Sequence, residues 1–300
     1  MSALLSALQG TIAAATDAPL LKPRLEPVRG GDINGARRIE DARGRRYFVK
    51  TNDGSDRAKT LAMFEAEQAA LEEIAATATV RVPRAWCVGA AEDDAYLVLE
   101  WLDLQRLDEH AAVRLGEQLA ALHRTTSPTF GWQRDNTIGS TPQINTASED
   151  WIEFWQLRRL EPQLRLAALK GFRGRLQRLG ENLLSDCPTF FLSYQPRPSL
   201  LHGDLWGGNA GALVTGEPVI FDPASYFGDR EADLAMTELF GGFPRDLHDA
   251  YRNAWPLDDG YSVRRDFYNL YHVLNHANLF SGAYAAQAER MTERLLAELR

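Results

Sequence analysis

The first hundred residues contain segments with strand-like and helix-like patterns of hydrophobic positions. The run RRYFVK at 45–50 alternates apolar and polar side chains after a turn at Gly44, and the segment that ends at Glu40 alternates before it. Together they predict a β-hairpin. AWCVG predicts a further strand, and the apolar run AYLVLEWL at 95–102 predicts a buried one. Helices are expected over about 3–15 and over 57–75, where the apolar positions have helical spacing.

From about residue 103 the pattern becomes mainly helical. Leu115, Leu119 and Leu122 have helical spacing, and a polar loop is expected over roughly 125–147. A long aromatic helix, WIEFWQLRRLEPQL, should follow, with Thr146 and Glu149 spaced as a capping box. Its tryptophans are expected in the core. Beyond it, 199–222 looks strand-like around a loop, and the stretch from about 262 is helical, with Phe267, Leu270, Tyr271 and Leu274 on one face.

These patterns predict an α+β fold with two lobes. The small β-rich N-terminal lobe should cover residues 1–102, and the larger, mainly helical C-terminal lobe should cover residues 103–300. A cleft is expected near residue 102, because ligands usually bind at loops and junctions between such parts.

Composition narrows the range of partners. The net charge of −8 argues against general nucleic-acid binding. Cys87 and Cys187 stand alone, which is typical of a reduced cytoplasmic protein and not of a disulfide framework. No stretch approaches the ~20 apolar residues of a membrane span, and the N-terminus lacks the pattern of a signal peptide. We therefore expect a cytoplasmic location and no membrane association.

The strongest chemical signal is LLHGDLWGGNAG followed by VIFDPAS. Asn209 lies five positions after Asp204, and Asp222 follows thirteen positions later, after an apolar run. Phosphoryl transfer from ATP needs one carboxylate for the proton of the attacking hydroxyl, and an amide oxygen and a second carboxylate to hold Mg²⁺. Each residue alone is also typical of a turn, but the full spacing, beginning at His202, predicts a kinase catalytic loop. Gly203 stands where protein kinases have arginine, which favours a small-molecule kinase.

A second signal links Lys50 with Glu67. Glu67 falls on the same helical face as Phe64, Leu71 and Ile74, whereas Glu65 points outward. A carboxylate on a buried face needs a cation, and Lys50, at the end of a strand, is a suitable partner. In kinases such a pair positions the phosphates of ATP.

Two weaker features complete the predicted nucleotide site. Gly30 and Gly31 in GGDING could form a simple turn, but their position before Lys50 favours a loop over the phosphates. Glu100, Trp101 and Leu102 follow the buried strand and occupy the hinge position, where backbone groups can read adenine. His272 and His276 have a spacing that zinc could use, but the Glu of HExxH is missing, and a core or surface pair is favoured.

The segments HGDLWGGN, FDPASYFGDREADLAM and FGWQRDNTIGSTPQINT resemble the fructosamine kinase (ketosamine-3-kinase) family, and the resemblance runs from about Gly30 to Tyr284. It implies the aminoglycoside-phosphotransferase-like version of the kinase fold. It also implies phosphorylation of the 3-hydroxyl of free or protein-bound ketosamines, whose 3-phosphate decomposes and frees the amine. In that family Asp204 would be the catalytic base, and Asn209 with Asp222 would hold Mg²⁺.

The resemblance also suggests finer roles. Asp233 would brace the catalytic loop from below together with His202, and Glu231 would contact the substrate. Trp206 would wall the sugar site, although core packing is an equal alternative. Some relatives carry cysteine where this chain has Asp32, so redox control at that position does not carry over.

Three functional hypotheses remain open. The first is an ATP-dependent ketosamine 3-kinase with a two-lobed protein-kinase-like fold, whose N-terminal lobe binds the nucleotide. Its oligomeric state is not determined by the sequence, and a monomer is favoured. The second is an aminoglycoside- or choline-type phosphotransferase of the same fold, which the HGD…N…D pattern alone also fits. The third is a pseudokinase that acts through partners, which is disfavoured because Lys50, Asp204 and Asp222 are all present.

Overall fold

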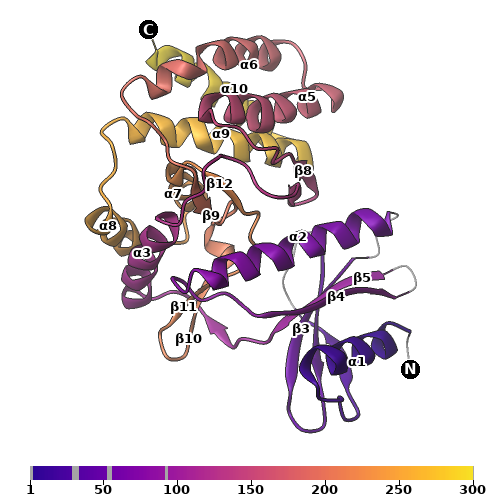
Figure 1. Cartoon of the computed structure of the whole chain (residues 1–300). Helices are drawn as coiled ribbons and strands as arrows, with labels where there is room; N and C mark the ends of the chain where they lie inside the picture. The colour runs from indigo at the N-terminus through magenta and orange to yellow at the C-terminus, as the bar shows by residue number, and fades with distance from the viewer. Residues whose placement is uncertain (1–2, 29–33, 53–55, 92–93, 300) are drawn as a thin grey trace.

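The N-terminal lobe is built on a five-stranded antiparallel sheet with the strand order β1-β2-β3-β5-β4 (Figure 1). The computed structural model describes residues 3–28, 34–52, 56–91 and 94–299. The hairpin expected around Gly44 is confirmed as β2–β3, and the expected buried strand as β5. The strands are β1 (Arg24–Pro27), β2 (Gly35–Glu40), β3 (Arg46–Asn52), β4 (Ala85–Ala91) and β5 (Asp94–Glu100).

Two helices cover opposite faces of this sheet. Helix α1 (Ala3–Thr16) packs on the face that carries Val49, and α2 (Arg57–Ala76) packs on the face that carries Leu97. Successive strand residues point to opposite faces, so Lys50, next to Val49, faces the side of α2. The side chain of Asp56 caps α2 by accepting a hydrogen bond from the amide of Lys59 (3.1 Å).

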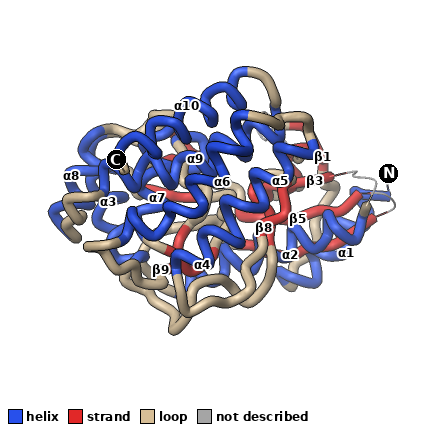
Figure 2. Tube along the Cα trace, turned by 90° about the horizontal axis from the view of Figure 1, so that it is seen from above, coloured by secondary structure: helices blue, strands red, loops and turns tan. Residues whose placement is uncertain are grey.

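The C-terminal lobe is mainly helical, as expected, and Figure 2 shows its helices grouped beside the strand-rich lobe. Helix α9 lies at its centre and packs against α5, α7 and α10. The predicted apolar face of α9 is confirmed, because its four residues are all buried: Phe267, Leu270, Tyr271 and Leu274. The helices are α3 (Glu109–His123), α4 (Trp151–Trp155), α5 (Glu161–Leu169), α6 (Arg175–Asp186), α7 (Arg230–Leu239), α8 (Arg245–Ala254), α9 (Tyr261–Phe280) and α10 (Ala283–Glu298).

Short strands support the loops between these helices. Strand β6 begins two residues after the predicted lobe boundary and pairs with β10, which also pairs with β11. Strand β9 pairs with β12, and β7 with β8. They are β6 (Leu104–Gln105), β7 (Asn136–Ile138), β8 (Thr141–Gln143), β9 (Ser199–Leu201), β10 (Ala210–Leu213), β11 (Pro218–Ile220) and β12 (Tyr226–Gly228).

The predicted capping box at Thr146 and Glu149 is wrong. Helix α4 begins later, and its cap is Asp150, whose carboxylate accepts hydrogen bonds from the amides of Ile152 (2.7 Å) and Glu153 (3.1 Å). An aspartate directly before the first turn satisfies the free amides there. The expected aromatic helix is confirmed, with a π-helical turn at Gln156–Leu160 between α4 and α5, and its tryptophans lie in the core as expected.

None of the helices in the described part of the chain combines the length and the apolar character needed to cross a membrane.

Candidate active site

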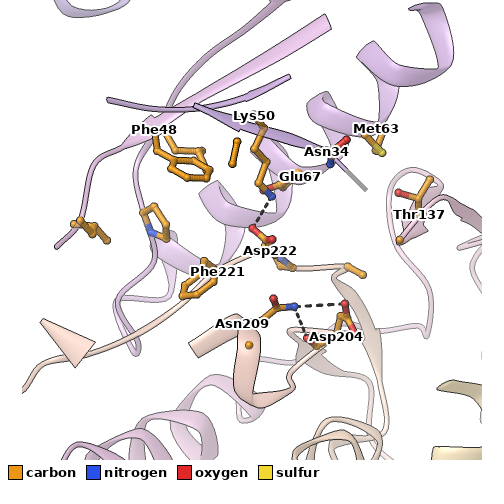
Figure 3. Close-up of a pocket in the computed structure, with 18 of the residues that line it drawn as sticks. Asn34, Phe48, Lys50, Met63, Glu67, Thr137, Asp204, Asn209, Phe221 and Asp222 are labelled. Atoms are coloured by element: carbon orange, nitrogen blue, oxygen red, sulfur yellow. Dashed lines mark hydrogen bonds and ion pairs between the residues drawn. The ribbon is translucent and has the colours of Figure 1, made fainter. Parts of the chain in front are cut away.

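A cavity of about 680 Å³ opens between the two lobes. Residues of the β3 strand and of α2 line it from one lobe, and the segments around 204–209 and 221–224 line it from the other. Figure 3 shows Lys50, Glu67, Asp222, Asn209 and Asp204 following one another across it. The structure thus brings together the predicted phosphate-binding pair and the predicted catalytic loop.

Lys50 is held by two carboxylates. Its Nζ lies 2.6 Å from Oε1 of Glu67 and 2.5 Å from Oδ1 of Asp222. Burial by itself lowers the pKa of Lys50, but the negative charges of Asp222 and Glu67 outweigh burial and raise that pKa well above its ordinary value. Lys50 is therefore a permanent cation at the centre of the cavity. Glu65 is exposed, as expected.

Asp222 has a left-handed backbone conformation, with φ at 59°. This region is uncommon for a residue other than glycine and is costly unless neighbouring structure imposes it. Here the amide of Ala224 donates to the carbonyl of His202 (2.9 Å), and the amide of Phe221 donates to the carbonyl of Asn209 (3.0 Å). Hydrogen bonds to the catalytic loop on both sides of Asp222 therefore hold it.

Asp204 and Asn209, five positions apart in the predicted catalytic loop, lie next to each other. Nδ2 of Asn209 donates to the carbonyl of Asp204 (2.9 Å) and approaches its Oδ2 (3.4 Å). Burial, and then the charges of Asp222 and Asp233, raise the pKa of Asp204 to about 7, and the Asn209 contact opposes them. A carboxylate with a pKa near neutrality can accept a proton from a hydroxyl more readily than an ordinary aspartate.

Asp233 on α7 supports the catalytic loop from below. Its carboxylate accepts hydrogen bonds from the amides of His202 (2.7 Å) and Gly203 (2.8 Å), and from Nε2 of His123 (3.2 Å). Burial by itself raises the pKa of Asp233, but the hydrogen bond and charge of His123, with help from His202 and Gly203, hold it below the ordinary value. The buried carboxylate is thus ionised and fully hydrogen-bonded.

His202 is a buried structural residue of the loop. Burial lowers the pKa of His202, which keeps the ring neutral. Its Nε2 lies 2.9 Å from the carbonyl oxygen of Phe221, and its Nδ1 lies 3.3 Å from the amide nitrogen of Asp204. A carbonyl only accepts and an amide only donates, so the proton belongs on Nε2. His202 therefore joins the catalytic loop to the segment that carries Asp222.

Gly203 has a steric reason to be glycine. Its φ is +84°, and a Cβ here would collide with the carbonyl oxygen of Ala224. The arginine of protein kinases could not occupy this position without moving the segment that carries Ala224.

The predicted hinge residues Glu100, Trp101 and Leu102 all line the cavity. The Glu100 carboxylate is engaged by Arg81 (2.6 Å), and its amide donates to the carbonyl of Arg84 (2.8 Å). The indole of Trp101 donates to Asp103 (2.8 Å). The strand end is therefore fixed by groups outside the cavity.

Glu231, predicted as a substrate contact, lies elsewhere. It is fully buried, and its carboxylate pairs with Arg264 of α9 at 2.7 and 3.1 Å. Residues two apart on a helix point about 200° from each other, so the face of α7 that directs Asp233 to the catalytic loop turns Glu231 away from it. Trp206, by contrast, lines the cavity and is 36% exposed. Its ring lies against Gly208, where a Cβ would collide with it.

Several lining residues were not predicted individually. Phe48 and Phe221 form apolar walls on the side of the cavity opposite Thr137 (Figure 3). Asn136, Thr137 and Gly139 come from the β7–β8 hairpin, inside a segment that the sequence singled out only by family resemblance. Nothing in their spacing from the catalytic loop indicates that they reach it.

The sequence offered two further sets of candidate residues, a histidine pair and two cysteines. Nδ1 of His276 bonds to the carbonyl of His272 (2.8 Å), a contact within the helix, and His272 is buried. Within the described ranges, no group of three or more His, Cys, Asp or Glu side chains is placed to hold a metal. Cys87 and Cys187 are both free thiols. Gly30, Gly31 and Asp32 lie outside the described residues.

Comparison with known proteins identifies close relatives. Residues 5–298 match the family model for fructosamine kinase. The chain is 45% identical to a probable ketoamine kinase of Synechocystis sp., covering 95% of this chain and 94% of that protein. It is 40% identical to the protein-ribulosamine 3-kinase, chloroplastic, of Arabidopsis thaliana, covering 92% and 84%. A crystal structure of a candidate fructosamine-3-kinase from Haemophilus somnus 129PT superposes with a TM-score of 0.87 at 27% identity and covers 96% of both chains.

Proposed function

Since this chain belongs to the fructosamine kinase family, we propose that it transfers the γ-phosphoryl group of ATP to the 3-hydroxyl of a ketosamine. The observation that carries the proposal is the convergence of Lys50, Asp204, Asn209 and Asp222 on one cavity. The name of the Arabidopsis relative, a ribulosamine 3-kinase, supports the choice of acceptor and of hydroxyl. The phosphorylated product would then decompose and release the amine, so the reaction would remove sugar from glycated amines or proteins.

We assign Asp204 the role of catalytic base. The acceptor oxygen attacks the γ-phosphorus, its proton passes to the Asp204 carboxylate, and the bond from the γ-phosphorus to the bridging oxygen breaks to leave ADP. The raised pKa of Asp204, about 7, suits this transfer. Asn209, His202 and Asp233 keep the carboxylate in position through the hydrogen bonds described above.

Lys50 would bind the phosphates of ATP, and Glu67 would hold Lys50 in place. Lys50 is also bound to Asp222. We propose that a phosphate oxygen takes over this position when ATP binds. Asp222 would then be free to hold the metal, while the Glu67 contact would keep Lys50 pointing into the cavity.

Asn209 and Asp222 fit a hard divalent cation, and we propose Mg²⁺. The Asn209 amide uses its nitrogen to contact Asp204, which leaves its oxygen available on the cavity side. The side chain of Asp222 is 39% exposed to the cavity. Mg²⁺ is commonly held by one or two protein oxygens together with substrate phosphates, so two side chains suffice. When bound, the ion neutralises charge on the phosphates.

The adenine site follows from the walls of the cavity. Phe48 and Phe221 would sandwich the base, while Trp101 and Leu102 offer backbone groups from the hinge. The backbone amide of Glu100 already donates to the carbonyl of Arg84, so Glu100 would position the hinge and would not donate this hydrogen bond to adenine. Gly30 and Gly31 stay a sequence prediction for the phosphate loop.

We further propose a lobe boundary near residue 102, which the pairing of β6 with β10 supports. Trp206 would wall the sugar site with its exposed indole. We also propose a monomeric enzyme that acts on free or protein-bound ketosamines. The two free cysteines support a cytoplasmic location for it.

The test is ATP consumption with Mg²⁺ and fructose-lysine or ribulose-lysine, beside an aminoglycoside and choline. Asp204→Asn should lower turnover by about 10²–10⁴-fold, the usual contribution of a general base, while ATP binding is kept. Asp249→Asn, an exposed aspartate on α8, is the matched control and should behave as the unmodified chain. Equal turnover in Asp204→Asn would remove Asp204 from the mechanism. Turnover on the aminoglycoside or on choline, without turnover on either ketosamine, would reject the ketosamine as the acceptor.

A further inference from the structure

The β7–β8 hairpin forms the wall of the cavity that faces away from the proposed adenine site. Figure 3 shows Thr137 on this wall, across the cavity from Phe48 and on the same side as Met63 of α2. Asp204 lies below Lys50 in the same view and is displaced from it toward the side of this wall. An acceptor that presents its hydroxyl to Asp204 must therefore occupy the space next to the hairpin.

The hairpin is held by a buried chain of amide side chains. Asn136 donates from Nδ2 to the carbonyl of Ser225 (2.9 Å), and its Oδ1 accepts from Gln143 (2.9 Å) and from Asn145 (2.9 Å). Gln143 also donates to the carbonyl of Ala224 (3.1 Å). Ala224 and Ser225 follow Asp222 closely in the chain, so the hairpin and the proposed metal carboxylate share one support.

The donor and the acceptor can be assigned for each hydrogen bond in this network of side chains. Arg159 can only donate, and its Nη2 contacts Oδ1 of Asn145 at 2.7 Å. The nitrogen of Asn145 must then face Asn136, and the nitrogen of Asn136 must face Ser225. From the other side, Tyr271 donates to Oε1 of Gln143 (2.7 Å). A buried network in which each of these hydrogen bonds can run in only one direction specifies one arrangement, so the wall is rigid.

Thr137 is the exception on this wall. Its strand neighbours Asn136 and Ile138 are buried, and strand alternation turns the Thr137 side chain to the opposite face, toward the cavity. Among the residues that the structure describes, none forms a hydrogen bond with its hydroxyl, while the amides around it are paired. A polar group presented by a rigid wall and left without a partner is suited to a ligand.

We propose that the β7–β8 hairpin recognises the acceptor, and that Thr137 is a specificity-determining residue whose hydroxyl hydrogen-bonds the polyhydroxyl chain of the sugar. This inference rests on the proposed ketosamine kinase function. Lys50 is the one cation among the described lining residues, and it lies with the phosphate-binding groups. The neutral Thr137 hydroxyl therefore fits a neutral polyol better than an acceptor that carries an anionic group in addition to the phosphates of ATP.

The experiment compares three variants of the full chain in steady-state kinetics with ATP, Mg²⁺ and fructose-lysine or ribulose-lysine. Thr137→Val removes the hydroxyl and keeps the shape, and Thr137→Ser keeps the hydroxyl. Ser140→Ala is the matched control, because Ser140 is an exposed hydroxyl in the same hairpin. Loss of one neutral hydrogen bond corresponds to about a five- to tenfold weaker interaction. We expect Thr137→Val to raise the KM for the ketosamine by this factor and to leave the KM for ATP unchanged. Thr137→Ser and Ser140→Ala should stay within about twofold.

The outcomes separate this inference from the function on which it rests. An active wild-type chain with an unchanged ketosamine KM in Thr137→Val would overturn the role of Thr137 alone. So would equal rises in the ketosamine KM and the ATP KM, since general loosening of the lobe predicts no selectivity. A wild-type chain that turns over no ketosamine would overturn the proposed function, and the acceptor role of the hairpin with it.

Discussion

Replacing Asp233 with asparagine should loosen the catalytic loop from helix α7 while leaving the phosphate-binding groups in place. The Asp233 carboxylate accepts from the amides of His202 and Gly203 and from the ring of His123. The two amides approach different oxygens of the carboxylate. An asparagine has one oxygen and one NH₂ group, so one backbone N–H would face another donor.

The magnitude follows from these contacts. One buried N–H left without an acceptor costs about 1–3 kcal/mol, and hydrogen bonds to a charged group contribute about 1 kcal/mol more each than neutral ones. Relief from burying a charge offsets part of this cost. We therefore expect the free energy of unfolding to fall by about 3 kcal/mol. At about 2–4 °C per kcal/mol for a chain of this size, Tm should fall by about 6–12 °C.

The assay combines urea unfolding, ATP binding and turnover. Asp233→Asn should lower kcat by at least tenfold, because the loop carrying Asp204 is displaced, and leave ATP affinity within about twofold, because Lys50 and Glu67 do not contact Asp233. Asp249→Asn is the matched control, since its surface ion pairs with Arg245 and Arg252 contribute little.

The stabilisation of the fold by Asp233 should depend on pH in one direction. Because the folded pKa of Asp233 lies below the unfolded value, its stabilisation is complete above the unfolded pKa, about 3.9, and is lost as the pH falls through the folded pKa. The stability difference between the wild type and Asp233→Asn should therefore shrink in acid. Equal stability of the two proteins at pH 7, with unchanged kcat, would refute the bracing role.

The remaining predictions concern a glycine and a buried ion pair. Gly203→Ala should lower stability by at least about 2 kcal/mol and reduce kcat, because left-handed strain adds to a collision with Ala224. Gly44→Ala, at a similar φ but with open space around it, should show the strain alone, and equal losses in the two variants would refute the collision. Glu231→Gln should cost about 3 kcal/mol in urea unfolding, because the buried Arg264 charge loses one of its two carboxylate partners and keeps only Asp258. The ketosamine KM of the folded Glu231→Gln variant should be unchanged, and an increase would restore Glu231 as a substrate contact.

Most of the predicted elements are confirmed because their signals are local. Strand alternation in RRYFVK put Lys50 on the face away from Val49, and helical spacing put Glu67 on the buried side of α2. Asp204 and Asn209, which the sequence places in one predicted loop, contact each other. Such patterns depend on backbone periodicity and short loops, which vary little between contexts.

Sequence and structure differ where several local solutions compete. Thr146 and Glu149 have the spacing of a capping box, but Asp150 lies directly before the first turn and caps the helix. The family resemblance suggested a substrate contact for Glu231, and the orientation of α7 turns its side chain toward Arg264. The choice depends on how a helix is rotated against its neighbours, and a short motif does not contain that information.

The sequence by itself thus predicted two lobes, a catalytic loop and the groups that we propose to handle ATP. Tertiary structure alone decided that Lys50 meets Asp222, 172 positions away, and that Thr137 of the β7–β8 hairpin shares their cavity. The physical reason is that periodicity and turn chemistry act over a few residues, whereas contacts between distant segments depend on the packing of the whole core.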